Sequence, residues 1–372
     1  MAGARAVKLE RVELRRIHLP LVAPFRASIG TLLHRDVLLV NVTLDGVEGW
    51  GECTAFGEPI YSYEYTDGAQ AVIRRHLLPL LSAENDLRAE DVARILAPVR
   101  GHPMAKAAVE MAILDAELRA QGRSFGDFLG ASRPVVDCGV SVGIHERVED
   151  LLRTVEGYLD EGYKRIKLKI EPGHDIADVR AVRERFGDIL LQVDANTAYT
   201  RSDGHHLAQL DELGLLLIEQ PLPEEDVLGH AEIAQIMRTP ICLDESITSA
   251  DIAADAIAMG ACSIVNIKAG RVGGYLEARR VHDVCAAHGV PVWCGGMLET
   301  GLGRAANVAL AALPNFTLPG DTSASGRYYA QDIVEPFVLE SGTLAVPTGP
   351  GLGVTPLEDE LKRFTVSVET CR

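Results

Sequence analysis

The sequence predicts an α/β barrel preceded by a smaller α+β domain. Five polar residues, Lys169, Asp194, Glu219, Asp244 and Lys268, follow one another at intervals of 25, 25, 25 and 24 residues. Each stands at or just past the end of a short apolar run, and a strand, a loop and a helix together use roughly this many residues. The chain before this regular part has a different pattern, in which polar and apolar positions alternate and Asp-Gly marks a turn.

The first part of the chain is expected to form the α+β domain, over residues 1–132. Three strands are predicted in "VKLERVELRRIHLP", "RDVLLVNVTLDG" and "VEGWGECTA", with a loop over residues 21–34 between the first two. Helical spacing follows over residues 63–81, 89–96 and 103–121, and the last of these begins with Pro and is followed by Gly.

The barrel domain is expected over residues 133–322, where β-rich runs alternate with helical ones. Near-continuous apolar runs are typical of parallel strands covered on both faces, and eight of them suit closure into a barrel. A doubly wound open sheet would not place five consecutive strand ends around one point. Residues 323–372 are expected to pack back on the first domain. The eight predicted strands are 138–144, 165–170, 190–194, 215–219, 241–244, 263–268, 291–294 and 316–318.

Composition and charge exclude several classes of protein. The net charge of −17 argues against nucleic acid or an anionic membrane as a partner, since both reward clustered Lys and Arg. An anionic substrate remains compatible, because a metal ion can dominate the local field. The seven cysteines contain no C-x-x-C pair, and no apolar run approaches the roughly 18 residues of a membrane span. We therefore expect a soluble, cytoplasmic protein with reduced thiols.

The three carboxylates of the series predict a metal site. Asp194, Glu219 and Asp244 would supply hard oxygen ligands from three successive strands, which is what Mg²⁺ or Mn²⁺ prefers. Zinc is disfavoured because no His or Cys occupies an equivalent strand end. Any one of these residues alone could merely cap a helix or pair with an arginine, but ordinary caps have no 25-residue register.

The lysines at the ends of the series predict proton transfer. Lys167 and Lys169 lie two apart on one strand and so point to the same face, and Lys268 comes from a strand roughly opposite. Positive charge from Lys167, Arg271 and a bound metal would lower a lysine pKa from about 10.4 toward the range of a useful base.

The reaction expected from this arrangement is removal of a proton next to a metal-bound carboxylate, which gives an enediolate. Reprotonation from the opposite face would racemise or epimerise the substrate. Elimination would follow instead if the β-carbon carried a leaving group. A third, non-catalytic interpretation is a metal-binding scaffold.

These residues resemble the enolase superfamily, in particular its muconate-lactonising-enzyme-like subgroup. That subgroup has an α+β capping domain and a modified TIM barrel, (β/α)₇β. It has K-x-K on the second strand, Asp, Glu and Asp metal ligands on the third to fifth, and Lys on the sixth. The mandelate-racemase-like subgroup expects a His on the seventh strand, where this chain has "PVWCGGM". The motifs "GVSVGI", "VDANTAY", "EQPL", "LDES", "NIKAGRVGG", "GGMLETGLGRA" and "LPGDTSAS" are similar to those of the N-succinylamino acid racemase and o-succinylbenzoate synthase family.

The resemblance implies a small-molecule carboxylate substrate, Mg²⁺ (or Mn²⁺ or another divalent ion) as cofactor, and a homo-oligomer. The activity it implies is racemisation of N-acyl, in particular N-succinyl, amino acids, with o-succinylbenzoate synthase as the alternative and both activities together as a further one. Dipeptide epimerase and muconate cycloisomerase are weaker alternatives. Dipeptide epimerases carry D-x-D after the eighth strand, where this chain has Asp321-Thr322-Ser323.

The resemblance also implies roles for residues outside the series. Lys167 would assist Lys169, and Asn196, Glu245 and Arg271 would support the inner site. Two capping loops, residues 23–33 and 56–61, would reach the substrate. For the aromatic residues, ordinary packing between domains is an equal alternative. The implied substrate contacts are Phe25, Ile29, Phe56, Ser141, Gly296, Met297, Leu298, Asp321, Ser323 and Tyr328.

Overall fold

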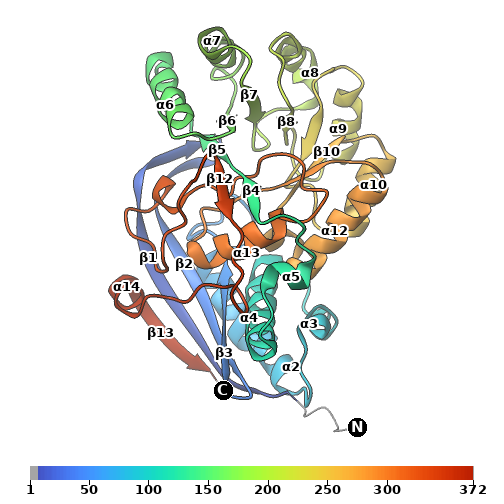
Figure 1. Ribbon diagram of the computed structural model, residues 1–372. Coiled ribbons are helices and arrows are strands. Elements are labelled where there is room, and N and C mark those ends of the chain that lie inside the picture. Colours follow the sequence, from blue (N-terminus) through green and yellow to red (C-terminus); the bar gives the residue numbers. More distant parts are fainter. Residues whose placement is uncertain (1–6, 372) are drawn as a thin grey trace.

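The computed structural model describes residues 7–371, which form an antiparallel sheet with helices and a parallel, curled sheet surrounded by helices (Figure 1). The antiparallel sheet has the strand order β13-β1-β2-β3. At its hairpin turn, Asp45 and Gly46 both have positive φ, which is the geometry that an Asp-Gly turn supplies. The strands are β1 (Leu9–Ala27), β2 (Gly30–Leu44), β3 (Val47–Cys53) and β13 (Thr365–Cys371).

The prediction of a loop over residues 21–34 is wrong. Strands β1 and β2 continue past the rest of the sheet as a long hairpin, in which Phe25 pairs with Leu32 and Ala27 with Gly30. The register of the pairing shifts between Pro20 and Phe25. This irregularity interrupts the alternation of polar and apolar residues, which is why the segment reads as a loop in the sequence.

The helices of the first domain follow the expected order, and the longest, α4, lies directly on strand β3. A Cβ added to Gly49 would come within 2.2 Å of the Ala112 carbonyl oxygen, and one added to Gly51 within 2.0 Å of that of Ala108. These glycines therefore permit a close approach of helix and strand. The helical segments are α1 (Thr66–Val72), a π-helical turn (Ile73–Leu77), α2 (Leu78–Ser82), α3 (Ala89–Leu96), α4 (Pro103–Gln121) and α5 (Phe125–Leu129).

The parallel sheet has the strand order β11-β10-β9-β8-β7-β6-β5, so each strand pairs with its neighbour in the chain. Helices connect the strands and lie outside the curled sheet (Figure 1). The strands are β5 (Gly139–Val142), β6 (Arg165–Lys169), β7 (Leu190–Asp194), β8 (Ile218–Glu219), β9 (Ile241–Leu243), β10 (Ile264–Ile267) and β11 (Val292–Cys294). The helices are α6 (Val148–Asp160), α7 (Ile176–Phe186), α8 (Gly204–Leu207), α9 (Val227–Ala234), α10 (Ala250–Ala258), α11 (Ala269–Val272), α12 (Tyr275–Ala287) and α13 (Gly301–Ala311).

The sequence predicts an eighth strand at residues 316–318, but no strand forms there. That stretch makes only an isolated bridge from Phe316 to Val292, and a second bridge joins Gly320 to Cys138. The Asp321 amide also donates to the Cys294 carbonyl at 2.8 Å. The segment therefore joins β11 to the β5 side of the ring through single contacts. Pro319 in its middle has no N–H to donate, which works against a regular ladder.

The last part of the chain returns to the antiparallel sheet, where β13 pairs with β1 (Figure 1). On the way, β12 (Thr343–Ala345) pairs with β4 (Val135–Asp137), and α14 (Glu358–Phe364) precedes β13. Short 3₁₀ segments occur at Arg201–Asp203, Ala208–Glu212 and Ser325–Arg327.

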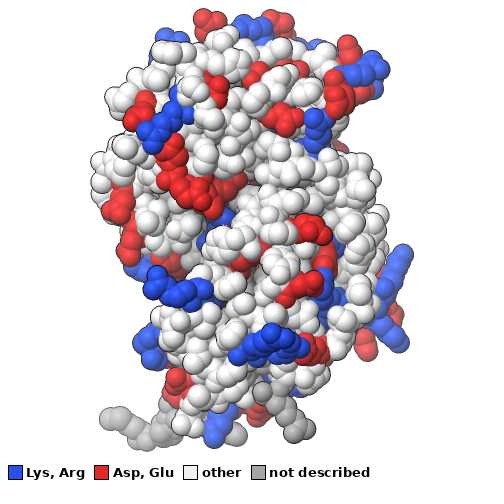
Figure 2. All heavy atoms as spheres, turned by 180° about the vertical axis from the view of Figure 1, so that it is seen from behind, with Lys and Arg blue, Asp and Glu red and all other residues white. Residues whose placement is uncertain are grey.

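Two general expectations can be compared with the folded chain. All seven cysteines lie in the described part, and none of them is in a disulfide. Between residues 7 and 371, no helix is both long enough and apolar enough to cross a membrane. The face seen in Figure 2 carries both acidic and basic side chains, scattered among uncharged surface.

Candidate active site

The five residues of the series lie together at the carboxyl ends of five adjacent strands. Lys169, Asp194 and Glu219 are the last residues of β6, β7 and β8, and in the parallel register Lys169 pairs with Asp194 and Asp194 with Glu219. Asp244 directly follows β9, and Lys268 directly follows β10. The three carboxylates thus come from the strands that separate the two lysines, as the sequence predicts.

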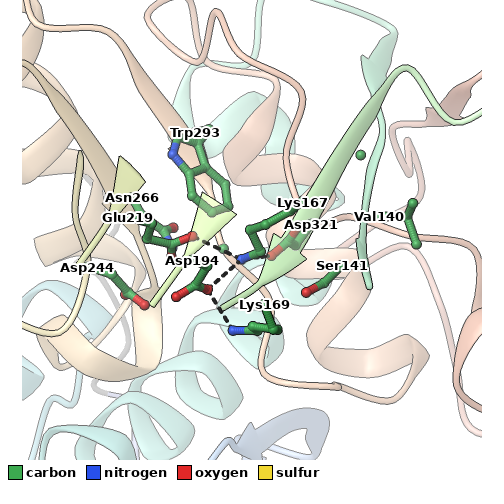
Figure 3. A network of polar contacts seen from close by, with 12 residues as sticks. Val140, Ser141, Lys167, Lys169, Asp194, Glu219, Asp244, Asn266, Trp293 and Asp321 are labelled. Atoms are coloured by element: carbon green, nitrogen blue, oxygen red, sulfur yellow. Dashed lines mark hydrogen bonds and ion pairs between the residues drawn. The ribbon is translucent and has the colours of Figure 1, made fainter. Parts of the chain in front are cut away.

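Each lysine contacts a carboxylate of this row. Lys169 Nζ lies 2.6 Å from Asp194 Oδ2, and Lys268 Nζ lies 2.6 Å from Asp244 Oδ2. Lys167 Nζ lies between two carboxylates, 3.2 Å from Asp194 Oδ2 and 3.1 Å from Glu219 Oε2 (Figure 3). Lys167 and Lys169 therefore share the carboxylate of Asp194, whereas Lys268 pairs with Asp244.

A third carboxylate, that of Asp321, also contacts Lys167. Asp321 Oδ2 lies 2.6 Å from Lys167 Nζ, and Arg165 Nη2 donates to Asp321 Oδ1 at 2.9 Å. The ring of Trp293 packs next to both cations, with its centroid 4.7 Å from Lys167 Nζ and 5.2 Å from Arg165 Cζ. Arg165 was missed in the sequence, although Arg165, Lys167 and Lys169 share one face of their strand at a spacing of two.

The residues expected to support the site do so through hydrogen bonds. Asn196 Oδ1 accepts from Lys169 Nζ at 2.5 Å, and its Nδ2 donates to Glu245 Oε1 at 2.9 Å. Arg271 donates to the Glu245 carbonyl and to the Glu224 carboxylate. These contacts link the ends of β7, β9 and β10 around the charged row, the name used here for the three lysines together with Asp194, Glu219 and Asp244.

Two further amide side chains hold the carboxylate-bearing residues, one through a side chain and one through the backbone, and were missed in the sequence. Asn266 Nδ2 donates to Glu219 Oε1 at 2.7 Å. Gln220 Oε1 accepts from the backbone amide of Asp244 at 3.0 Å and from that of Ser246 at 3.2 Å. Asn266 stands two residues before Lys268 and therefore on the same face, so the alternation of side chains along the strand could have identified it.

A cavity of about 530 Å³, counting the solvent-filled mouth, opens onto the lysines. Lys167, Lys169 and Lys268 line it, together with Asn196 and Tyr61. Ser323 is not among the lining residues; its hydroxyl donates to the Gly139 carbonyl at 3.1 Å. The other residues implied as substrate contacts all line the cavity: Phe25, Ile29, Phe56, Ser141, Gly296, Met297, Leu298, Asp321 and Tyr328.

The first domain covers this cavity with the tip of the β1–β2 hairpin. The Ser28 hydroxyl donates to the carbonyl oxygens of Ala195 and Asn196 at 3.1 and 3.2 Å, directly after β7. The Ile144 amide donates to the Arg26 carbonyl at 3.0 Å, after β5. The segment between β3 and α1 contributes Phe56 and Tyr61 to the same wall. Both regions therefore act as a cap over the strand ends.

The three carboxylates of the charged row differ in how readily they ionise. Burial and repulsion by Asp194 raise the pKa of Glu219 to about 8, and burial raises the pKa of Asp244 to about 6. Burial also disfavours the charge of Asp194, yet the ammonium groups of Lys169 and Lys167 lower the pKa of that carboxyl below its usual range. Glu219 and Asp244 would thus be more easily ionised if another cation lay near them.

The pKa values of two lysines are shifted in the opposite direction from the expected one. Burial disfavours their charge, but Asp321 and Glu219 raise the pKa of Lys167, and Asp244 raises the pKa of Lys268. The carboxylates outweigh the neighbouring positive charges as the site stands. A cation held by the same carboxylates would weaken this effect.

The donor set suits a hard divalent cation. Asp194, Glu219 and Asp244 are fully or almost fully buried, and Asp244 Oδ1 has no hydrogen-bond partner within the described chain. A buried, unpartnered carboxylate oxygen is costly unless a ligand satisfies it. The three carboxylates do not stand as a ready-made coordination cluster, since no such group of acidic, His or Cys side chains occurs within residues 7–371. Lysine ammonium groups contact Oδ2 of Asp194 and Oδ2 of Asp244 instead.

Carboxylates and lysines on consecutive strand ends of a barrel, beneath an α+β cap, define an enzyme of the enolase superfamily. The chain belongs to the mandelate racemase / muconate lactonizing enzyme family: residues 11–130 match the N-terminal domain of that description, and residues 150–360 match the enolase C-terminal domain-like family. Enzymes of this family are divalent-metal dependent.

The chain is similar over nearly its whole length to enzymes with two different names. It is 66% identical to the N-succinylamino acid racemase of Amycolatopsis sp, over 97% of this chain and 98% of the relative. It is 45% identical to the o-succinylbenzoate synthase of Geobacillus kaustophilus, over 97% and 96%. A solved structure from Listeria innocua Clip11262, a member of the enolase superfamily, matches with a TM-score of 0.94 at 42% identity, over 98% of this chain and 99% of that one.

Proposed function

We propose that this enzyme racemises N-succinylamino acids by moving the α-proton between two lysines. The observation that carries the proposal is that Lys169 and Lys268 line one cavity from strands separated by the three carboxylate-bearing strands. Two ammonium groups so placed can act on opposite faces of one carbon. The 66% identity to an N-succinylamino acid racemase supports this assignment of the substrate.

The cation that we propose is Mg²⁺, with Mn²⁺ or another divalent ion as the alternative, held by Asp194, Glu219 and Asp244. When bound, it would neutralise the substrate carboxylate and stabilise the negative charge that forms on proton removal. The chain's own residues do the rest. One lysine, as the free amine, takes the α-proton from one face, and the other, as the ammonium, returns a proton to the opposite face.

The surroundings of Asp321 support a substrate whose nitrogen is acylated. Lys167 and Arg165 occupy the two oxygens of this carboxylate, so it is not free to bind the ammonium group of an unmodified amino acid. Much of the remaining cavity wall is apolar, as at Phe25, Ile29 and Met297. An uncharged amide nitrogen suits such a wall better than an ammonium group does.

Exchange of the α-proton with solvent tests the proposal. Each enantiomer of an N-succinylamino acid is incubated with the enzyme and Mg²⁺ in D₂O, and deuterium at Cα is followed by NMR. We expect deuterium in both enantiomers and equal amounts of the two at equilibrium. Exchange in neither enantiomer would contradict the proposal.

The second candidate is o-succinylbenzoate synthase, a dehydratase that acts on a cyclohexadiene carboxylate. The 45% identity to the Geobacillus kaustophilus enzyme favours it, and the same charged row could remove the proton that starts the elimination. In this reaction one lysine acts as the base, and the other serves as a cation near the intermediate. Comparing kcat/KM for the two substrates ranks the candidates, and comparable values would show that one site performs both reactions.

A further inference from the structure

Lys268 is held in part by a side chain that comes from outside the barrel. Tyr61 lies between β3 and α1, and Lys268 Nζ donates to its phenolic oxygen at 3.0 Å. The same ammonium group lies 4.9 Å from the centroid of the Tyr61 ring. The Tyr61 hydroxyl in turn donates to Asp244 Oδ2 at 3.4 Å. Tyr61 therefore contacts both members of the Lys268–Asp244 pair.

Packing holds Tyr61 in this position. Its ring lies 5.7 Å from that of Phe56, and the guanidinium of Arg271 stands 5.5 Å from its centroid on the barrel side. Phe56 is itself fixed, because the Arg35 guanidinium lies 4.6 Å from its ring and the Thr66 amide donates to its carbonyl at 2.8 Å. The phenol is therefore placed before a substrate arrives, as a positioning group requires.

The other lysine is held differently. Lys169 Nζ contacts Asp194 Oδ2 at 2.6 Å and Asn196 Oδ1 at 2.5 Å, and both partners belong to the barrel. Within residues 7–371, no hydrogen bond or ion pair joins Tyr61 to Lys169. The two proton-transfer groups are thus unequal: the barrel alone orients Lys169, whereas the cap contributes to the orientation of Lys268.

We propose that Tyr61 is a positioning residue for Lys268, and that it fixes the direction of the ammonium group for proton transfer on one face of the substrate only. A lysine side chain has four rotatable bonds, so a carboxylate alone leaves its Nζ several orientations. Hydrogen bonding to the Tyr61 oxygen and contact with its ring restrict them. This inference rests on the proposed racemase function.

The test follows α-proton exchange from each enantiomer separately in wild type, Tyr61→Phe and Tyr61→Leu, at saturating Mg²⁺. Lys268→Ala first identifies the enantiomer that depends on Lys268, as the one whose exchange is lost. For that enantiomer, we expect kcat for exchange to fall about tenfold in Tyr61→Phe, which loses a hydrogen bond to a charged group, and further in Tyr61→Leu. KM should change little, and exchange from the other enantiomer should stay within about twofold of wild type.

Two controls separate positioning from a general effect on the fold or on the cation site. Tyr63→Phe alters an exposed tyrosine of the same segment and should leave both exchange rates unchanged. Mg²⁺ affinity, measured by isothermal titration calorimetry, should be the same in Tyr61→Phe and wild type. An equal loss of exchange from both enantiomers, or a loss of Mg²⁺ affinity that accounts for it, would overturn the inference while the racemase proposal stands. Failure of the wild type to exchange either enantiomer would overturn both.

Discussion

Asp321 joins two buried cations: its Oδ2 lies 2.6 Å from Lys167 Nζ, and its Oδ1 accepts from Arg165 Nη2 at 2.9 Å. Burial opposes the charge of Asp321, but the two cations lower the pKa of this carboxyl below its usual range. Since Lys167 also contacts Asp194 and Glu219, Asp321 links the segment after Pro319 to the charged row.

Asp321→Asn should therefore destabilise the protein and impair catalysis together. Removing one charge of a buried pair leaves the others uncompensated, which typically costs about 3–5 kcal/mol. We expect a loss of roughly this size in the free energy of unfolding by urea, with a fall in kcat of at least about tenfold. The matched control is Asp137→Asn, which removes an exposed partner of Lys164 and should cost less than about 1 kcal/mol. A free energy of unfolding equal to that of wild type in Asp321→Asn would refute the proposed stabilising role of the contacts that Asp321 makes with Lys167 and Arg165.

Lys169→Ala and Lys268→Ala should each abolish racemisation, because each removes the proton-transfer group of one face. In each variant we expect the surviving lysine to exchange the α-proton of one enantiomer, so the two variants should retain exchange from opposite enantiomers. Chiral chromatography measures the racemisation, and NMR in D₂O measures the exchange. Lys164→Ala, which alters an exposed lysine before β6, serves as the control. Retention of racemisation in either active-site variant would exclude the two-lysine mechanism.

Removal of divalent cations should abolish both proposed activities reversibly. Dialysis against EDTA is expected to reduce kcat to background, and Mg²⁺ or Mn²⁺ should restore it. Asp194→Asn should weaken Mg²⁺ binding, measured by isothermal titration calorimetry, because it removes a charged oxygen donor. Full activity in the presence of excess EDTA would contradict the assignment of the three carboxylates as cation ligands.

Ser141→Ala should affect substrate binding more than turnover. The Ser141 hydroxyl lines the cavity and has no hydrogen-bond partner within residues 7–371, so a polar group of the substrate would satisfy it. We expect KM for an N-succinylamino acid to rise about fivefold to tenfold, with kcat within about twofold. Ser323→Ala alters a buried hydroxyl outside the cavity wall and is the matched control. An unchanged KM would show that Ser141 makes no such contact.

Glu110→Gln should change how stability depends on pH. Glu110 of α4 is buried and accepts from the Leu276 amide at the start of α12, and burial raises its pKa from 4.5 to about 7. The folded protein therefore binds this proton more tightly than the unfolded chain does. The resulting stability is fully present below pH 4.5 and is lost as pH rises through 7. A shift of this size corresponds to roughly 3 kcal/mol.

The measurement for Glu110 is the free energy of unfolding by urea between pH 4.5 and 8. We expect the loss of stability toward high pH to be smaller in Glu110→Gln than in wild type, since glutamine does not titrate. Glu90→Gln, in the first turn of α3 and exposed, is the control and should leave the slope unchanged. Identical slopes for Glu110→Gln and wild type would argue against the raised pKa.

The sequence alone was sufficient to predict the architecture and the charged row, because both follow from regular spacing. The carboxyl ends of the strands in a barrel lie at one rim. A 25-residue interval therefore places Asp194 and Glu219 next to each other, whatever the conformation of the connecting loops. The incorrect predictions concern segments in which the regular pattern of the sequence is interrupted. A register shift in β1 made the hairpin read as a loop, and the apolar run at residues 316–318 lacks the ladder that would make it a strand.

The partners of the charged row were harder to predict, because they depend on contacts between segments far apart in the chain. Asp321 could be recognised as a site residue, but not as the partner of Lys167 and Arg165. Tyr61 lies 207 residues from Lys268, and nothing in its local sequence distinguishes it from the neighbouring Tyr63, which is exposed. Asn266 and Arg165, by contrast, could have been found from the alternation of their strands.

The pairing of β13 with β1 has a consequence for the order in which the chain can be completed. It joins residues as far apart as Val12 and Cys371, with the whole barrel synthesised between them. During synthesis on the ribosome, one edge of β1 therefore stays unpaired until β13 emerges. Unpaired strand edges can pair with other chains. The β1–β2 hairpin that covers the active site includes this same strand. A nascent chain can therefore form its barrel before the sheet of its cap is complete.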